Sequence, residues 1–259
     1  MVVSANLVEI FSSVQGEGTH VGESTIFVRF GGCDLRCAWC DSPHTWRPAR
    51  ECRLERRRAT GVFERIPNPV PLDAALAAID ALDPEAHRFV SLTGGEPLLQ
   101  ANAVRELARA LRDRGTRIHL ETHGLAVEAL EKVIEVVDVV SMDWKLASDV
   151  RRAADPPGRV AADFHPIHAE FLRAARRAPE VLVKVVVTAV TTDEELDEMS
   201  RQVAAVDPET CVILQPVTPI TQQVKCAPVG RLLDWVARLS ESLSDVRLIP
   251  QTHRSYGAP

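Results

Sequence analysis

The chain has 259 residues, 46% apolar and 25% charged, so it is long enough to bury a sizeable core in one large domain. No apolar run approaches the ~18 residues of a membrane span, which argues against a membrane protein. Thirty Lys plus Arg against 36 Asp plus Glu give a net charge of −6, and this charge argues against direct nucleic-acid binding.

Short apolar or β-branched runs predict buried strands, and amphipathic stretches between them predict helices. The expected strands cover residues 24–30, 89–93, 117–121, 137–142, 181–187, 211–214 and 246–249. The expected helices lie around residues 72–82, 104–111, 196–203 and 232–239, and Gly115 is a stop signal for the second. This alternation indicates an α/β fold, a partial (β/α) barrel of parallel strands with six to seven βα units. A doubly wound open sheet is the alternative.

We expect a single domain over residues 1–259, with a cysteine-bearing loop at 31–46 and an Arg-rich excursion at 47–70. Unusual polar segments follow the predicted strands: GGCDLRCAWCDS, TGGEP, ETHG, SMDWK, QPVTP and PQTH. Because ligands bind beyond the C-terminal ends of parallel strands, this one-sided placement predicts an active site at that edge of the sheet.

Three of the six cysteines, Cys33, Cys37 and Cys40, lie within eight residues. The first residues lack the basic and apolar regions of a signal peptide, so we expect a cytoplasmic protein. In that compartment a cysteine cluster indicates metal or redox chemistry rather than disulfides. Three thiolates leave one position open, and two interpretations remain on the cysteines alone. His44 would complete a zinc site, whereas an iron–sulfur cluster would keep one iron free for a ligand.

The CxxxCxxC spacing after the first strand, together with Gly-Gly-Glu-Pro after the second, resembles the radical S-adenosylmethionine (SAM) superfamily. The resemblance implies that the three cysteines hold a 4Fe-4S cluster and that SAM chelates the open iron. Gly94 and Gly95 are then expected to let the cofactor approach the backbone closely, and Glu96 to accept a hydrogen bond from its ammonium group. The other interpretation of this motif is an ordinary turn before a helix.

Further stretches resemble the 7-carboxy-7-deazaguanine synthase family: QGEG at residues 15–18, WCDSxxT at 39–45 and QTH at 251–253. The resemblance implies a radical SAM lyase that converts 6-carboxy-5,6,7,8-tetrahydropterin to 7-carboxy-7-deazaguanine with loss of ammonia. It further implies catalytic use of SAM, a requirement for Mg²⁺, and a place in the synthesis of queuosine and related tRNA nucleosides.

The same resemblance assigns site residues. The Gln15 amide is expected to pair with the edge of the heterocycle, Arg29 to grip the substrate carboxylate bidentately, and the Ser42 hydroxyl to reach Mg²⁺. The implied substrate contacts are Val14, Gln15, Gly16, Glu17, Arg29, Thr93, His253 and Pro259. The implied SAM contacts are Trp39, Cys40, Asp41, Gly94, Gly95, Glu96, Glu121, Ser141, Asp143, Lys145, Gln215, Pro216, Val217 and Thr218.

One segment departs from the family pattern. The family has Ser-Pro-Lys where this chain has SMDWK, which inserts two residues between Ser141 and Lys145. Asp143 and Glu121 are therefore both candidates to accept from the ribose hydroxyls of SAM. Lys184, in the apolar run VLVKVVV, is expected to be paired or to point into the site, and His119 is interpreted as a satisfied structural histidine.

Two alternative functions are weighed. A glycyl-radical activating enzyme shares CxxxCxxC and an Asp-x-Lys feature, but it does not account for QGEG or Arg29. A non-catalytic zinc or iron–sulfur electron-transfer module is the second. Among partners we expect an acidic electron donor such as flavodoxin at the basic stretch from Arg47 to Arg65, whose other interpretation is a solvated excursion. From the resemblance we also expect a second copy in a homodimer.

Overall fold

The computed structural model describes residues 3–156, 163–219 and 224–257, without the side chains of residues 254 and 256. Its main feature is a 10-stranded sheet with the order β14-β13-β12-β10-β9-β8-β3-β2-β5-β6. Seven neighbouring strands are parallel: β3 (Ser24–Phe30), β8 (Phe89–Gly94), β9 (Ile118–Thr122), β10 (Val139–Asp143), β12 (Glu180–Val187), β13 (Cys211–Pro216) and β14 (Val246–Leu248). These strands match the seven that the sequence predicts, and the partial-barrel fold class is confirmed.

The remaining strands extend or brace this sheet. On its edge, β2 (Leu7–Val14) is antiparallel to β3, β5 (Glu51–Glu55) is parallel to β2, and β6 (Phe63–Pro67) is antiparallel to β5. Much of the 47–70 excursion is therefore a hairpin that continues the sheet. Two small ribbons pair β1 (Ser4–Ala5) with β7 (Val70–Pro71) and β4 (Leu35–Cys37) with β11 (Val150–Arg152).

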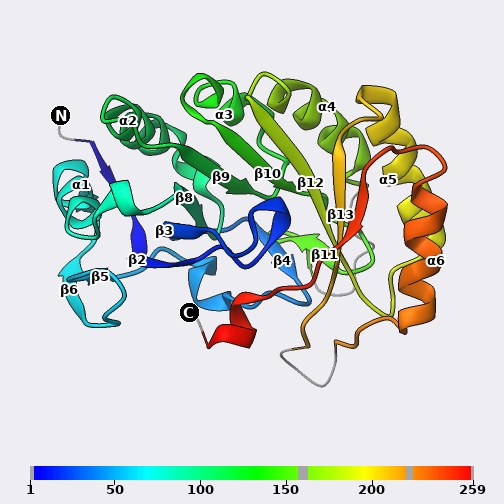
Figure 1. Ribbon diagram of the computed structural model, residues 1–259, viewed down its shortest axis with the longest axis horizontal. Helices are drawn as coiled ribbons and strands as arrows, with labels where there is room; N and C mark the ends of the chain where they lie inside the picture. The colour runs from blue at the N-terminus through cyan, green and yellow to red at the C-terminus, as the bar shows by residue number, and fades with distance from the viewer. Residues whose placement is uncertain (1–2, 157–162, 220–223, 258–259) are drawn as a thin grey trace.

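Helices cover the outer face of the curved sheet (Figure 1). They are α1 (Leu72–Asp80), α2 (Ala101–Arg112), α3 (Val127–Leu130), α4 (His165–Ala175), α5 (Asp193–Val206) and α6 (Val229–Leu239). The predicted apolar face of α2 is buried, and α5 begins at a capping box formed by Thr192 and Glu195. The sequence analysis does not predict α3 or α4. Single 3-10 turns are η1 (Gly18–His20), η2 (Pro43–Trp46), η3 (Pro84–Ala86), η4 (Pro97–Gln100), η5 (Ile134–Val136) and η6 (His253–Tyr256).

Side chains fill the end of the barrel at which its parallel strands begin. A small cluster there contains Phe89 and Leu182, and the β2–β3 connection folds against it. In that connection the His20 ring lies 4.7 Å from the Phe89 ring, and His20 Nε2 lies 2.8 Å from the Glu180 carboxylate. Ligand space is therefore confined to the opposite end, where the parallel strands finish.

Among the described residues, no helix combines the length and the apolar character needed to cross a bilayer.

Candidate active site

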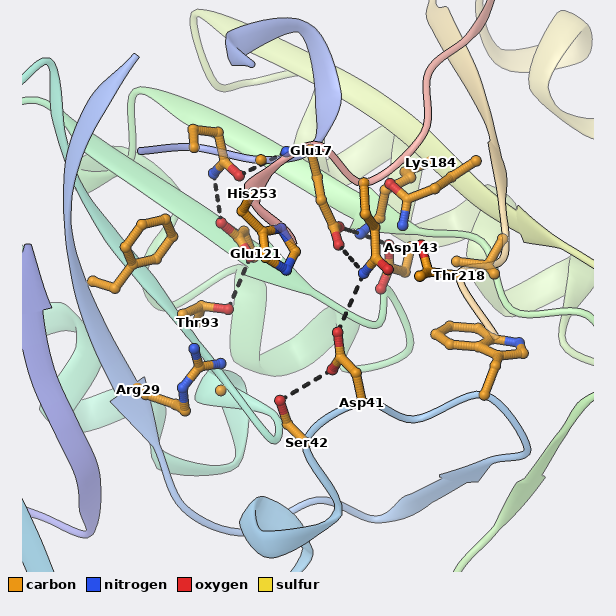
Figure 2. A pocket seen from close by; sticks show the side chains of 18 of the residues that line it. Glu17, Arg29, Asp41, Ser42, Thr93, Glu121, Asp143, Lys184, Thr218 and His253 are labelled. Carbon is orange, nitrogen blue, oxygen red and sulfur yellow. Dashed lines mark hydrogen bonds and ion pairs between the residues drawn. The ribbon is translucent and has the colours of Figure 1, made fainter. Parts of the chain in front are cut away.

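A cavity of about 500 Å³ opens at the C-terminal ends of the parallel strands (Figure 2). It brings together residues from seven strands, the β2–β3 connection, the cysteine loop and the C-terminal tail. The sequence-predicted residues that line it are Val14, Gln15, Gly16, Glu17, Arg29, Trp39, Asp41, Ser42, Thr93, Gly94, Glu121, Asp143, Gln215, Val217, Thr218 and His253. The cavity thus lies at the edge of the sheet that the polar segments predicted.

The cysteine loop of residues 31–46 is closed at its base, because the Gly32 N–H donates to the Thr45 carbonyl at 2.7 Å. Cys33 and Cys37 pack against an apolar patch. Burial raises the pKa of Cys33 to about 11 and that of Cys37 to about 12, and it also raises the pKa of Cys40. Only the thiolate is a metal ligand, so a metal bound here would have to displace these protons.

The arrangement of these thiols bears on the two metal interpretations. Among the described residues, no three His, Cys, Asp or Glu side chains are grouped closely enough for a single metal ion. His44, the proposed fourth zinc ligand, is exposed at the cavity rim. A single zinc needs its ligands to converge on one point, whereas an iron–sulfur cluster binds each thiolate on a different iron.

The Gly-Gly-Glu-Pro turn packs directly on the cysteine loop. A Cβ on Gly95 would lie 2.1 Å from the Gly32 carbonyl oxygen, and the Glu96 N–H donates to that oxygen at 2.8 Å. A Cβ on Gly94 would lie 2.3 Å from the Phe30 carbonyl oxygen. These contacts explain why both positions are glycine. Gly94 also lines the cavity, and the approach of a cofactor to this backbone stays a prediction.

Glu96 also differs from its expected role. Its side chain is fully buried, and its carboxylate accepts from the Leu98 N–H, the Thr122 hydroxyl and the His123 N–H. It caps the η4 turn and ties β9 to it, so it is not available to bind the ammonium of SAM.

The floor of the cavity is built round Glu121. Its Oε1 accepts from Gln15 Nε2 and the Ser91 hydroxyl, each at 2.8 Å, and its Oε2 accepts from the Thr93 hydroxyl at 2.9 Å. Burial raises the pKa of Glu121, but His119, Lys184 and the hydrogen bonds from Gln15 and Ser91 outweigh burial and hold the pKa below its usual range. Figure 2 shows Thr93 and Glu121 facing each other across the floor.

One wall carries an alternating set of charges. Asp143 Oδ2 lies 2.7 Å from Lys145 Nζ, and Asp143 Oδ1 lies 2.9 Å from Lys184 Nζ, which also pairs with Glu17. Although burial opposes it, the two ammonium groups lower the pKa of Asp143 to about 2. Lys145 itself lies 4.5 Å above the Trp39 ring. Lys184 is therefore paired and also points into the site, as the sequence suggested.

At the rim, Arg29 Nε donates to Glu9 at 2.9 Å. This is the only side-chain hydrogen bond of that guanidinium among the described residues, and its terminal nitrogens face the cavity (Figure 2). The Ser42 hydroxyl donates to Asp41 at 3.0 Å, and Asp41 accepts from Gln251 of the tail at 3.2 Å.

The tail is fastened to the N-terminal loop. The Thr252 N–H donates to the Gly16 carbonyl at 2.9 Å, and Gln251 Nε2 donates to Glu17 at 2.6 Å. A Cβ on Gly16 would lie 2.3 Å from the His253 ring, so glycine is required for that imidazole to sit there. Pro259, the predicted terminal contact, lies outside the described residues.

Several predicted residues do not line the cavity. The three cysteines, Gly95 and Pro216 are half-buried and outside the lining, and Glu96, Ser141 and Lys145 are buried and outside it. Conversely, the cavity includes residues that the sequence analysis does not assign to the site: Glu9, Phe11, Phe27, Val186 and Gln251. The alternation of Glu9 and Phe11 on β2 is the signal that would have placed both on one face.

Two buried polar atoms without hydrogen-bond partners in the described part of the chain indicate where a cofactor could bind. Trp39 Nε1 and Gln215 Oε1 are buried without a hydrogen-bond partner among the described residues, and both side chains line the cavity. An unpaired buried donor or acceptor is costly, so each marks a place where a ligand with complementary groups is favoured. Together with the sheltered thiols, they fit an iron–sulfur cluster and SAM.

Comparisons with known proteins also support an iron–sulfur cluster and SAM. Residues 27–204 match the radical SAM superfamily. The chain is 37% identical to the 7-carboxy-7-deazaguanine synthase of Geobacter sulfurreducens over 98% of this chain and 97% of that one. It is 36% identical to the enzyme of the same name from Methanopyrus kandleri over 96% and 92%. The fold resembles the crystal structure of QueE from Escherichia coli, with a TM-score of 0.58, 22% identity and coverage of 96% and 95%.

The packing of the glycine turn leads to a prediction. Gly95→Ala forces a Cβ against the Gly32 carbonyl, so we expect it to lower the free energy of unfolding by about 1–3 kcal/mol or more. Gly230→Ala in α6 is the matched control, because a Cβ there meets nothing within 4 Å and alanine favours helix. Urea denaturation of both variants measures the difference. Equal stabilities would contradict the packing role.

Proposed function

The chain belongs to the radical SAM superfamily and, within it, to the 7-carboxy-7-deazaguanine synthase family, and we propose on this premise how its cavity performs the reaction. The reaction converts 6-carboxy-5,6,7,8-tetrahydropterin to 7-carboxy-7-deazaguanine with loss of ammonia. The observation that carries the assignment to this cavity is its position, at the strand ends between the cysteine loop and the Gln15–Glu121 floor. The glycyl-radical and zinc alternatives are set aside, since neither matches these relatives.

Cys33, Cys37 and Cys40 hold the cluster in this proposal, and SAM occupies the side of the cavity next to Trp39. Bound there, the cluster and SAM supply the radical that removes a hydrogen atom from the substrate. Trp39 Nε1 donates to the cofactor and Gln215 Oε1 accepts from it, which satisfies both orphaned atoms. The neighbouring predicted contacts, Asp41, Asp143, Val217 and Thr218, line the same side.

The charges of the cavity support this division. Its lining contains the carboxylates of Glu9, Glu17, Asp41, Glu121 and Asp143, whereas the Lys and Arg side chains that line it among the described residues are Arg29 and Lys184. An acidic lining favours a sulfonium group and Mg²⁺. The same lining repels a substrate carboxylate, so the guanidinium that faces the cavity becomes necessary to bind one.

The pterin lies on the Gln15–Glu121 floor in this proposal. Glu121 Oε1 already accepts from Gln15 and Ser91, whereas Oε2 accepts from Thr93 and has a further lone pair for a heterocycle N–H. Arg29 binds the substrate carboxylate through its terminal nitrogens. The protein already uses the Gln15 amide for Glu121 and for the Glu17 N–H, so its pairing with the heterocycle edge is not the main contact. Val14, Gly16, Thr93 and His253 complete the substrate side.

Mg²⁺ is proposed to bind at Ser42. Its hydroxyl and the Asp41 carboxylate lie 3.0 Å apart at the rim, and hydroxyl, carboxylate and substrate oxygens are the ligands that Mg²⁺ prefers.

We also propose that an acidic electron donor such as flavodoxin docks on the 47–70 segment and that the enzyme is a homodimer. The segment has seven arginines and three glutamates in a chain of net charge −6. In the β5–β6 hairpin, the side chains of Arg56 and Arg65 are 63% and 66% exposed. Cluster reduction by flavodoxin should therefore slow as salt is added, and an unchanged rate would reject this dock. Sedimentation analysis measures the mass in solution, and a mass of one chain would reject the homodimer.

The first test is turnover. The protein, reconstituted anaerobically with iron and sulfide, is expected to turn brown and, with SAM, reductant, Mg²⁺ and 6-carboxy-5,6,7,8-tetrahydropterin, to release 7-carboxy-7-deazaguanine. Chromatography with mass detection measures the product. Cys37→Ala is the control, because it removes one of the three thiolates and with it the cluster.

Two results would reject the assignment. A colourless protein that binds zinc would exclude the cluster. Reductive cleavage of SAM with no deazaguanine formed would reject the substrate while leaving the superfamily chemistry in place.

The magnesium site is tested by Ser42→Ala. Loss of one oxygen ligand should raise the Mg²⁺ concentration for half-maximal rate about tenfold, equivalent to about 1.4 kcal/mol. Ser42→Thr keeps the hydroxyl and should stay close to the parent. If the alanine and threonine variants titrate alike, Ser42 is not a magnesium ligand.

A further inference from the structure

A histidine lies directly beneath the cavity floor. His119 precedes Glu121 by two residues on β9, so both side chains lie on the same face of the strand. Its side chain is 3% exposed. Its Nδ1 lies 3.4 Å from Gln15 Nε2 and 3.9 Å from Glu121 Oε1. Its Nε2 is buried without a hydrogen-bond partner among the described residues, so this is not the satisfied structural histidine that the sequence suggested.

The charge and tautomer of this ring follow from its surroundings. Burial lowers the pKa of His119 to about 4, so the imidazole is neutral near pH 7. The charged groups that act on it are Glu121 of its own strand, His20 of η1, and Glu180 and Lys184 of β12. Because Nδ1 faces the NH₂ group of Gln15, Nδ1 must be the acceptor, and the proton resides on Nε2.

This contact completes the hydrogen bonding of the Gln15 amide. Gln15 Nε2 donates one hydrogen to Glu121 at 2.8 Å and directs the other at His119 Nδ1, while Gln15 Oε1 accepts from the Glu17 N–H at 3.0 Å. A flipped amide would set its oxygen against the Glu121 carboxylate and the Nδ1 lone pair. The Glu121 carboxylate therefore selects this orientation of the amide, and His119 Nδ1 accepts the second hydrogen that this orientation presents.

We propose that His119 is a positioning residue for pterin binding: its Nδ1 fixes the Gln15 amide, and the amide fixes the Glu121 carboxylate, in the orientation that meets the heterocycle. This role rests on the proposed function. His119 does not touch the substrate itself, since it is not part of the cavity lining. It acts through Gln15 and Glu121, whose side chains do line the cavity.

The test uses substitutions that separate the acceptor from the ring. His119→Asn keeps an acceptor oxygen near the place of Nδ1, His119→Gln moves it toward the place of Nε2, and His119→Leu removes it while retaining bulk. The dissociation constant of 6-carboxy-5,6,7,8-tetrahydropterin is measured on reconstituted protein without reductant, alongside KM and kcat with saturating SAM. His87→Leu, at a half-buried histidine outside the cavity, is the control.

We expect His119→Leu and His119→Gln to weaken pterin binding about tenfold, the scale of one lost hydrogen bond, with the iron content unchanged. His119→Asn should stay within about threefold of the parent. In a Gln15→Ala background His119→Leu should add little, because the amide that it positions is gone.

Other outcomes would overturn the role. If Asn, Gln and Leu weaken binding equally, or if the Leu effect adds fully to Gln15→Ala, His119 acts only by packing. If His119→Leu does not retain iron or fold, the comparison of Asn with Gln decides alone. If the parent binds the pterin without turning it over, the proposed function fails while the comparison of dissociation constants still stands. A parent that does not bind the pterin rejects both.

Discussion

The site depends on a close backbone contact between the ends of β3 and β8. Gly94 and Gly95 lie against the carbonyls of Phe30 and Gly32, at distances that leave no room for a side chain. The Gly95 N–H donates to Phe30 and the Glu96 N–H to Gly32, at 3.0 and 2.8 Å. Since Gly32 opens the cysteine loop, this contact sets where the three thiols stand relative to the strand ends. A side chain at either glycine would have to displace this backbone.

Around that contact, the molecule keeps several charges out of bulk water by pairing each one. Glu121 accepts three hydrogen bonds, and Asp143 has two ammonium partners. The Glu96 carboxylate accepts from Thr122, His123 and Leu98. An unpaired buried charge is strongly unfavourable, so these networks fix side-chain orientations as well as charge. A preorganised polar floor is what a reaction through a radical needs, because loosely held groups would let water enter.

Segments far apart in the chain meet at the cavity for a common reason. The β2–β3 connection folds down into the barrel, where it covers Phe89 and reaches Glu180, and on its way it presents Gln15 and Glu17 to the cavity. The C-terminal tail is then fastened to that connection by Thr252 and Gln251. The same loop therefore closes one end of the barrel and shapes the other, which links the stability of the fold to the geometry of the site.

The sequence by itself determined the parallel strands, the edge that carries the site, the cysteine loop and the family, because strand periodicity and short motifs are local patterns. The tertiary structure decided what no local pattern holds. Gly94 and Gly95 lie against neighbouring backbone, and Glu96 caps the η4 turn. β2 places Glu9 beside Arg29, and His119 meets Gln15 across 104 residues of chain. Side-chain partners separated this far are chosen by how the layers pack, and only the folded molecule brings them within hydrogen-bond distance.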